Sequence, residues 1–178
     1  MFKDLILYHK ESNLHERLHI NKVINTKLID NIAELRKSEF PIIFKSNIIL
    51  RKIVETKKAH IITNCEEIFQ HDSINSRNSG VDHIICKLAS FNNIAFAFNF
   101  NLVLRNSGQR RAKILGRMIQ NVILFRKYKV KMILTSLATN EYELRSQDAL
   151  RSFGSVIGMS PKETLDATQY VTMMFSKV

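Results

Sequence analysis

The chain has 178 residues, of which 45% are hydrophobic and 24% charged, and its formal net charge at pH 7 is +11. This composition fits a single globular domain over 1–178 and excludes disordered and fibrous proteins. No apolar run approaches the roughly 18–20 residues that span a bilayer, and Cys65 and Cys86 form no disulfide framework, so we expect a cytoplasmic protein with buried thiols and no membrane partner.

Short apolar runs alternate with amphipathic segments along most of the chain. The runs are continuous rather than alternating, as expected of parallel strands buried on both faces. The predicted strands are Leu5–Tyr8, Phe40–Lys45, His60–Thr63, Ile94–Phe100, Lys131–Thr135 and Ser155–Met159. The predicted helices cover 27–37, 47–57, 81–91, 107–128, 146–153 and 160–168. This alternation predicts a parallel α/β fold, either a doubly wound sheet or a barrel.

Helix-start signals and irregular segments refine this outline. Capping residues precede three of the helices: Ser46 or Asn47, Asn106 or Ser107, and Ser160 followed by Pro161. The least regular regions are 9–26 and 64–80. The second follows a predicted strand at its carboxyl end, where functional loops gather in parallel α/β folds.

The dominant feature is Arg105–Lys131, which holds nine Lys or Arg residues and no acid, and so supplies +9 of the net charge of +11. Such a stretch on a predicted helix indicates a polyanionic partner, because phosphate contacts dominate nucleic-acid affinity. One helical face presents Arg110, Lys113, Arg117, Gln120, Asn121 and Lys127, and the opposite face is apolar. Arg111 and Arg126 fall toward the apolar side, where we expect structural ion pairs.

Other patterns favour ordinary structural roles. The segment His15–His19 matches His-Glu-x-x-His, which on a helix can bind zinc, but it lacks the continuation of such a site, and a polar surface segment is favoured. Asp82, His83 and Asp148 are interpreted as helix-start residues. No nucleophile triad, phosphate loop or Cys-x-x-Cys motif is present, so we predict no catalytic residue and no metal ligand in this chain.

Six segments follow one another in the order of a known family. They are RNSGVDHIICKLA at 77–89, NNIAFAFNF at 92–100, RAKILGRMIQNV at 111–122, RKYKVKMILTSLA at 126–138, YELRSQDALRSFG at 142–154 and VIGMSPKE at 156–163. Together they resemble the ribonuclease P protein component 3 family, the archaeal counterpart of the eukaryotic thirty-kilodalton subunit. The match is clearest over 77–167, whereas residues 1–39 show little similarity.

The resemblance implies a TIM-barrel-like parallel (β/α) barrel, short or irregular at its N-terminal side, since six strands are predicted where a full barrel has eight. It also implies a subunit of the ribonucleoprotein that generates mature tRNA 5′ ends by endonucleolytic cleavage of precursor tRNA, with the RNA as catalyst. The implied partners are ribonuclease P RNA, precursor tRNA and other protein subunits, especially protein component 2. No cofactor is expected on this chain, and divalent metal (Mg) is expected on the RNA.

The resemblance and the charge pattern together give two sets of residues. The expected RNA-binding residues are Arg77, Arg110, Lys113, Arg117, Lys127, Lys129, Lys131 and Arg145. The expected structural family positions are Asn78, Asp82, His83, Asn99, Arg111, Arg126, Ser136 and Asp148.

Two alternatives stay open. A metal-dependent phosphoesterase-type barrel with its own active site would need converging His and carboxylate side chains, and only His60, His71 and His83 are expected near strand ends. A basic structural module whose interface is protein is the other alternative, and a steep fall of RNA affinity with salt would argue against it.

Overall fold

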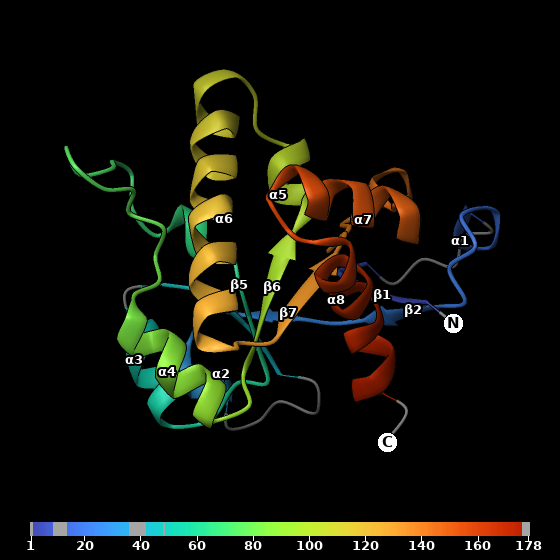
Figure 1. Cartoon of the computed structure of the whole chain (residues 1–178). Helices are drawn as coiled ribbons and strands as arrows, with labels where there is room; N and C mark the ends of the chain where they lie inside the picture. Colours follow the sequence, from blue (N-terminus) through green and yellow to red (C-terminus); the bar gives the residue numbers. More distant parts are fainter. Residues whose placement is uncertain (1, 9–13, 36–41, 48, 176–178) are drawn as a thin grey trace.

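A computed structural model describes residues 2–8, 14–35, 42–47 and 49–175 and shows strands surrounded by helices (Figure 1). The strands are β1 (Lys3–Ile6), β2 (Lys22–Asn25), β3 (Leu28–Ile29), β4 (Ile43–Lys45), β5 (Ile61–Thr63), β6 (Ala95–Asn99) and β7 (Met132–Thr135). The helices are α1 (Leu14–Arg17), α2 (Ile32–Leu35), α3 (Leu50–Glu55), α4 (His83–Phe91), α5 (Phe100–Leu104), α6 (Gly108–Tyr128), α7 (Gln147–Val156) and α8 (Pro161–Met174). Two 3₁₀ turns, η1 (Cys65–Glu67) and η2 (Glu141–Glu143), follow β5 and β7. None of the described helices combines the length and apolar character needed to cross a membrane.

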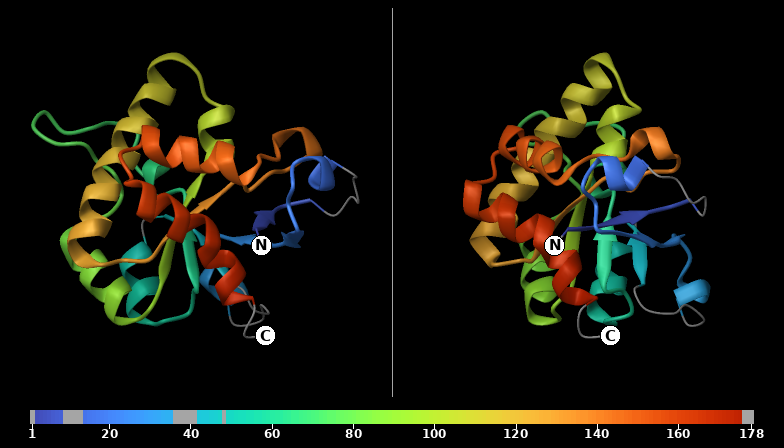
Figure 2. Two further views of the ribbon diagram at one scale, coloured as in Figure 1. Left: turned by 45° about the vertical axis from the view of Figure 1, so that its right-hand side comes forward. Right: turned by 90° about the vertical axis from the view of Figure 1, so that its right-hand side faces the viewer.

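All strand pairs are parallel, and their order runs around a small barrel. Strands β3 to β7 pair in sequence order, and β2, which precedes β3 by two residues, pairs with β1. The side between β7 and β1 is joined by a parallel bridge between Ile6 and Ala138 rather than by a ladder. Helix α8 packs against both β7 and β1 and covers this side (Figure 2). The fold is thus TIM-barrel-like, as predicted.

The core has two layers because successive strand residues point to opposite faces. The inner layer is built from Leu5, Ile43, Ile61, Ala95, Ala97, Ile133 and Leu137, together with Val171 of α8. The outer layer includes Phe44, Ile62, Phe96, Phe98 and Leu134, which pack against the helices. The ring of Phe125 from α6 lies 4.7 Å from that of Phe96 and 5.8 Å from that of Phe98, between ring centroids. Burial on both faces explains the continuous apolar runs in the sequence.

The predicted strand at Ser155–Met159 is wrong, because this segment ends α7 and forms the turn to α8. Gly158 has a φ of +88°, and its N–H donates to the carbonyl of Ser155 at 3.0 Å. The N–H of Met159 donates to the carbonyl of Gly154, also at 3.0 Å. These two bonds form a helix-terminating motif that a glycine in the left-handed region makes possible, and its apolar flanks resemble a strand in sequence.

The N-terminal third departs most from the prediction. The predicted helix over 27–37 is wrong at its start, where Leu28–Ile29 forms β3, and α2 has only four residues. Residues 36–41, which include the start of the predicted strand Phe40–Lys45, lie outside the described residues. Strand β2 lies in the region predicted as irregular. Strand β2 forms because it pairs with β1, and β3 because it pairs with β4. The local sequence pattern says little about such pairing.

The capping predictions have mixed outcomes. Ser160 and Glu163 form a reciprocal capping box at α8, with Pro161 at the first position, as predicted. Ser107 is the N-cap of α6 but makes no side-chain capping bond. The N-cap of α3 is Ile49, so neither Ser46 nor Asn47 caps it.

Candidate nucleic-acid interface

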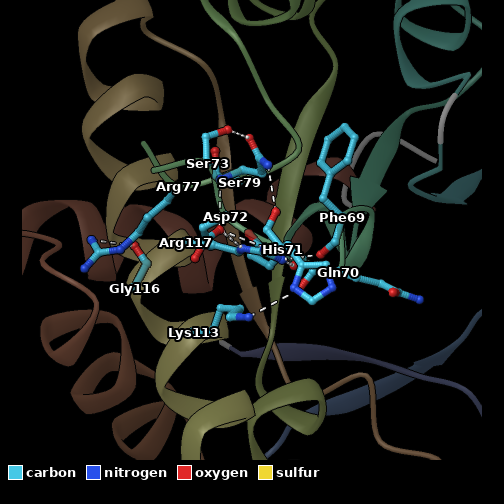
Figure 3. Close-up of polar contacts among 12 residues, drawn as sticks. Phe69, Gln70, His71, Asp72, Ser73, Arg77, Ser79, Lys113, Gly116 and Arg117 are labelled. Carbon is cyan, nitrogen blue, oxygen red and sulfur yellow. Dashed lines mark hydrogen bonds and ion pairs between the residues drawn. The ribbon is translucent and has the colours of Figure 1, made fainter. Parts of the chain in front are cut away.

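Helix α6 is tied to the segment 64–80, which follows β5, by side chains along its first two-thirds, from Arg110 to Asn121 (Figure 3). The segment begins at Asn64, which has a φ of +60°, and ends near Gly80, which has a φ of +81°. A Cβ atom at Gly80 would lie 2.1 Å from the carbonyl oxygen of Cys65. The two ends of the segment are therefore close together, and it forms a compact loop against α6.

Arg117 is the centre of this contact, and its side chain is only 3% exposed. Its Nε donates to Asp72 Oδ1 at 2.8 Å, and Nη1 donates to the carbonyls of Glu66 and Phe69 at 2.7 and 2.6 Å. Burial acts to raise the pKa of Asp72, but bonds from Arg117 and from the N–H of Asn78 outweigh it and hold the pKa below its usual value. The prediction that Arg117 faces outward to RNA is wrong, since the loop covers it.

Asn121, also predicted to face outward, is buried one turn further along α6. Its Nδ2 donates to Glu66 Oε1 at 2.8 Å and to the carbonyl of Ser79 at 3.2 Å. Burial raises the pKa of Glu66 to about 7, and the Asn121 bond and the charge of Arg117 act against that rise. Gln120 donates to Ser79 Oγ at 3.2 Å. The face predicted to meet RNA is therefore largely the face that holds the loop.

Three of the predicted RNA-binding cations form a rim around this junction, in which Arg77 and Arg110 are exposed and Lys113 is half-buried. The Arg110 side chain is 70% exposed, with Nη2 3.3 Å from Glu67 Oε1. Lys113 Nζ donates to the carbonyl of Gln70 at 3.3 Å, and Arg77 Nη1 donates to that of Gly116 at 3.3 Å. Each of these contacts is long and uses one donor, so the other donors of the three side chains can bind a further partner. Arg77, Arg110 and Lys113 are hereafter the rim cations.

Lys127, Lys129 and Lys131 lie at the other end of α6 and in the turn to β7, and all three are exposed. A helix of 21 residues is about 30 Å long. The positive charge of the basic stretch is therefore divided between two surfaces, one near each end of α6.

The remaining predicted arginines are engaged with the protein. Arg111 is exposed, contrary to prediction, and donates to the carbonyls of Leu104 and Asn106, so it binds the end of α5 and the turn that follows. Arg126 is also exposed, contrary to prediction, with 47% of its side chain accessible, but it forms the predicted ion pair, with Nη2 2.7 Å from Glu163 Oε2. That hydrogen bond lowers the pKa of Glu163 to about 2. Arg145 lies 5.4 Å over the ring of Phe100 and donates to two nearby carbonyls, so stacking and local bonds hold it.

Several family positions have the structural roles expected of them. Asp82 is the N-cap of α4 and accepts from the N–H of Ile85 at 2.7 Å, and His83 is the exposed first residue of that helix. Asp148 is exposed in the first turn of α7, 3.9 Å from Arg151. These residues are helix-start residues, as predicted.

The other family positions hold loops and strand ends. Asn78 binds within the loop, donating from Nδ2 to the carbonyl of His71 at 2.7 Å. Asn99 caps α5 and donates to Asn64 Oδ1 at 3.0 Å. Ser136 donates to Asp4, which lies on β1.

Two buried acids, Asp4 and Glu143, hold segments of the fold together, and the sequence pattern did not single them out. Asp4 is fully buried and accepts from Thr135 Oγ1 at 2.7 Å and from the N–H of Ser136 at 3.0 Å, which ties β1 to β7. Burial raises the pKa of Asp4, and these hydrogen bonds oppose the rise. Glu143 accepts from Arg105 Nε at 2.9 Å and from the N–H of Thr139 at 2.8 Å. The available signal for Asp4 was its position next to a predicted strand, in the segment Phe-Lys-Asp-Leu-Ile, where it is the one acid.

The five histidines that the structure describes do not assemble as a metal site. His60 immediately precedes β5 and so lies at the amino end of that strand, whereas His71 and His83 follow its carboxyl end. In His15–His19 the helix ends at Arg17, and His19 has a φ of +53°, so the two imidazoles are not on one helical face. Within the described ranges, no three His, Cys, Asp or Glu residues are grouped as metal ligands. Cys65 and Cys86 are free and buried, as predicted.

Comparison with known proteins agrees with the resemblance. The model of the family "RNase P subunit p30" matches residues 32–176. "Ribonuclease P protein component 3" of Methanosarcina mazei is 32% identical over 105 residues, which are 59% of this chain and 44% of that protein. The protein of the same name from Methanococcus vannielii is 24% identical over 152 residues, 83% of this chain and 63% of that one. The chain thus spans about half the length of these relatives.

A solved structure supports the fold. A chain in the cryo-EM structure of archaeal ribonuclease P with mature tRNA is similar over 98% of this chain and 82% of its own length, with a TM-score of 0.70 and 20% identity. The family model covers most of the sequence, including the basic helix and the 64–80 loop. The chain therefore belongs to the RNase P subunit p30 family.

Proposed function

We propose that this chain is a protein subunit of ribonuclease P, which matures tRNA 5′ ends, and that it binds and supports the catalytic RNA of that complex in the cytoplasm. The family match over 32–176 carries the proposal. The exposed cations near both ends of α6 fit it physically, because they lower the repulsion between RNA phosphates. The RNA, with its bound Mg, supplies the chemistry, and protein component 2 is the partner subunit.

The carboxyl ends of the strands favour this binding role over a phosphoesterase site. Polar groups there are engaged with one another: Thr63 Oγ1 donates to the carbonyl of Ala97 at 3.0 Å, and Asn99 donates to Asn64. Asp4 is occupied by Thr135 and Ser136. A phosphoesterase needs acids and imidazoles directed into an open site, whereas these groups hold strand ends together.

The test is reconstitution with the cognate RNA and precursor tRNA. We expect addition of the chain to lower the magnesium concentration needed for cleavage. Exchange of the three rim cations for Gln (R77Q/R110Q/K113Q) should raise that concentration and reduce the salt dependence of RNA affinity, by about 0.7–0.9 in the log–log slope per lost phosphate contact. The matched control is Lys22→Gln, an exposed cation on β2.

Two results would contradict the proposal. If the chain leaves cleavage unchanged at every magnesium concentration, it is not a functional subunit. If the purified chain hydrolyses phosphodiesters without RNA, and Mn²⁺ or Zn²⁺ increases that activity, the phosphoesterase alternative is correct. Cleavage that depends on the chain but is unaffected by the rim exchange would refute only the assignment of the rim cations.

A further inference from the structure

Lysines alternate with aromatic rings across the turn after α3 and the C-terminal parts of α4 and α6. Lys57 Nζ lies 5.3 Å from the ring centroid of Phe91, and Lys87 Nζ lies 6.0 Å from that of Tyr128. Lys127 Nζ is 5.6 Å from the same tyrosine ring. Phe91 and Lys87 are four residues apart on α4 and so share a face. These five residues form one continuous strip, hereafter the lysine–aromatic strip.

Four of the five residues of the strip are exposed, Tyr128 is half-buried, and few acids neutralise the strip. The Phe91 side chain is 79% exposed, and the three lysines are exposed as well. Helix α4 contains no acid, and neither does 108–131; the acid of α3, Glu55, is held by Arg51 at 2.9 Å. Lys129 and Lys131 continue the positive charge beside Tyr128. The surface therefore combines an accessible ring with lysines that form no ion pair within the described part of the chain.

The position of the strip separates it from the rim cations. Helices α3, α4 and α6 come together at the lower end of Figure 1, where α6 turns into β7. This is the amino end of the strands, whereas the rim cations lie around the start of α6. The two surfaces can therefore contact different parts of one RNA.

Stability alone does not account for the strip. Cations near a helix C-terminus gain from the helix dipole, which explains Lys127, and lysine stems can cover apolar rings. Neither effect favours a phenylalanine that is four-fifths exposed. Base stacking on aromatic rings, combined with cations that bind phosphates, is the usual arrangement of sites for single-stranded nucleic acid.

We infer that the lysine–aromatic strip binds a single-stranded segment of RNA, with phosphates on Lys57, Lys87 and Lys127 and bases stacked on Phe91 and Tyr128. The inference rests on the proposed function for the identity of the RNA. Because every base has a π face, the site accepts different sequences. A duplex has its bases stacked internally, so it can use only the lysines.

The experiment measures binding of the full chain to a labelled 12-nucleotide oligo(A) RNA and to an RNA duplex of the same length. Phe91→Leu removes the ring but keeps an apolar side chain at an exposed position, so the fold should persist. We expect this variant to weaken oligo(A) binding about fivefold or more and to change duplex binding less than twofold. K57Q/K87Q/K127Q should weaken both, with a fall of about 2 in the log–log salt slope for oligo(A). Lys22→Gln is the matched control.

The outcomes separate the two proposals. Oligo(A) binding like wild type in both strip variants overturns the strip assignment, and so does an equal loss of single-stranded and duplex binding in Phe91→Leu. Loss of binding to an acidic protein subunit, with RNA binding intact, also overturns it in favour of a protein interface. If reconstituted cleavage still depends on the chain in these cases, the proposed function stands. Selective loss of oligo(A) binding supports the strip whatever the reconstitution shows.

Discussion

Replacement of Arg117 by alanine tests whether this residue holds the 64–80 loop rather than RNA. The substitution removes a nearly buried guanidinium that contacts Asp72 and the carbonyls of Glu66 and Phe69. Because its side chain is 3% exposed, water cannot replace these donors without opening the loop. We therefore expect a large loss of stability, and the loop should become accessible.

The expected loss of unfolding free energy follows from the acceptor groups that the substitution leaves without a donor. Two carbonyls lose a charged donor, at about 1–3 kcal/mol each when they stay buried. Asp72 is 26% exposed and keeps the N–H of Asn78, so water compensates part of its loss. Removal of one partner of a buried pair typically costs about 3–5 kcal/mol. For a chain of this length, that corresponds to a fall in Tm of about 10 °C.

Urea and thermal unfolding measure the loss, and limited proteolysis reports whether cleavage moves into residues 64–80. The matched control is Arg110→Ala, which removes an arginine that is 70% exposed and should cost less than about 1 kcal/mol. A loss of less than about 1 kcal/mol in Arg117→Ala, with an unchanged proteolysis pattern, would refute the structural role. Reduced RNA affinity without reduced stability would restore Arg117 as an RNA contact.

Two further predictions concern the backbone and pH. Gly80 and Gly158 both have positive φ, but a Cβ would meet the carbonyl of Cys65 only at Gly80. Gly158→Ala should therefore cost about 1 kcal/mol and Gly80→Ala at least about 3 kcal/mol in urea unfolding; equal costs would contradict the close contact. Glu163 has its pKa lowered to about 2, chiefly by the bond from Arg126, so its stabilisation is present above pH 4.5 and lost as the pH falls toward 2. Because Arg126 is 47% exposed, Glu163→Gln should lose only about 1 kcal/mol at pH 7, and a difference that persists at pH 2 would contradict the pair.

The parallel α/β class and the C-terminal elements were predictable because local signals coincided there. Helix α8 has a serine, a proline and a glutamate at its first positions, and the structure contains the corresponding capping box at Ser160. Strands β5, β6 and β7 are apolar on both faces, which produces runs that periodicity can find. Strands β2 and β3 have four and two residues. These two segments are strands because they pair with other segments of the chain, so the local sequence pattern could not predict them.

The candidate interface was predicted only in part. A helical wheel shows on which face of a helix a side chain lies, but not whether another segment of the chain covers that face. Arg117 and Asn121 were placed correctly on the polar face of α6, but that face is covered by the 64–80 loop. The loop is polar and was predicted as a functional segment. A polar face opposite a polar loop can be an internal interface as well as an external one. The contacting residues are 42–55 positions apart in the sequence, so local pattern does not reveal that they pair.

The division between arginine and lysine within Arg105–Lys131 carries information that net charge conceals. Four of its five arginines form ion pairs with acids from outside the stretch: Glu143, Glu67, Asp72 and Glu163. Its four lysines form none among the described residues. The planar guanidinium can make several hydrogen bonds at once and suits fixed contacts, whereas the hydrated ammonium stays at the surface. Although the stretch contains no acid, most of its arginines are therefore neutralised by acids elsewhere in the chain. The charge that remains available to a partner is mainly that of the lysines. Three of the four lysines lie at the end of α6 that carries the lysine–aromatic strip.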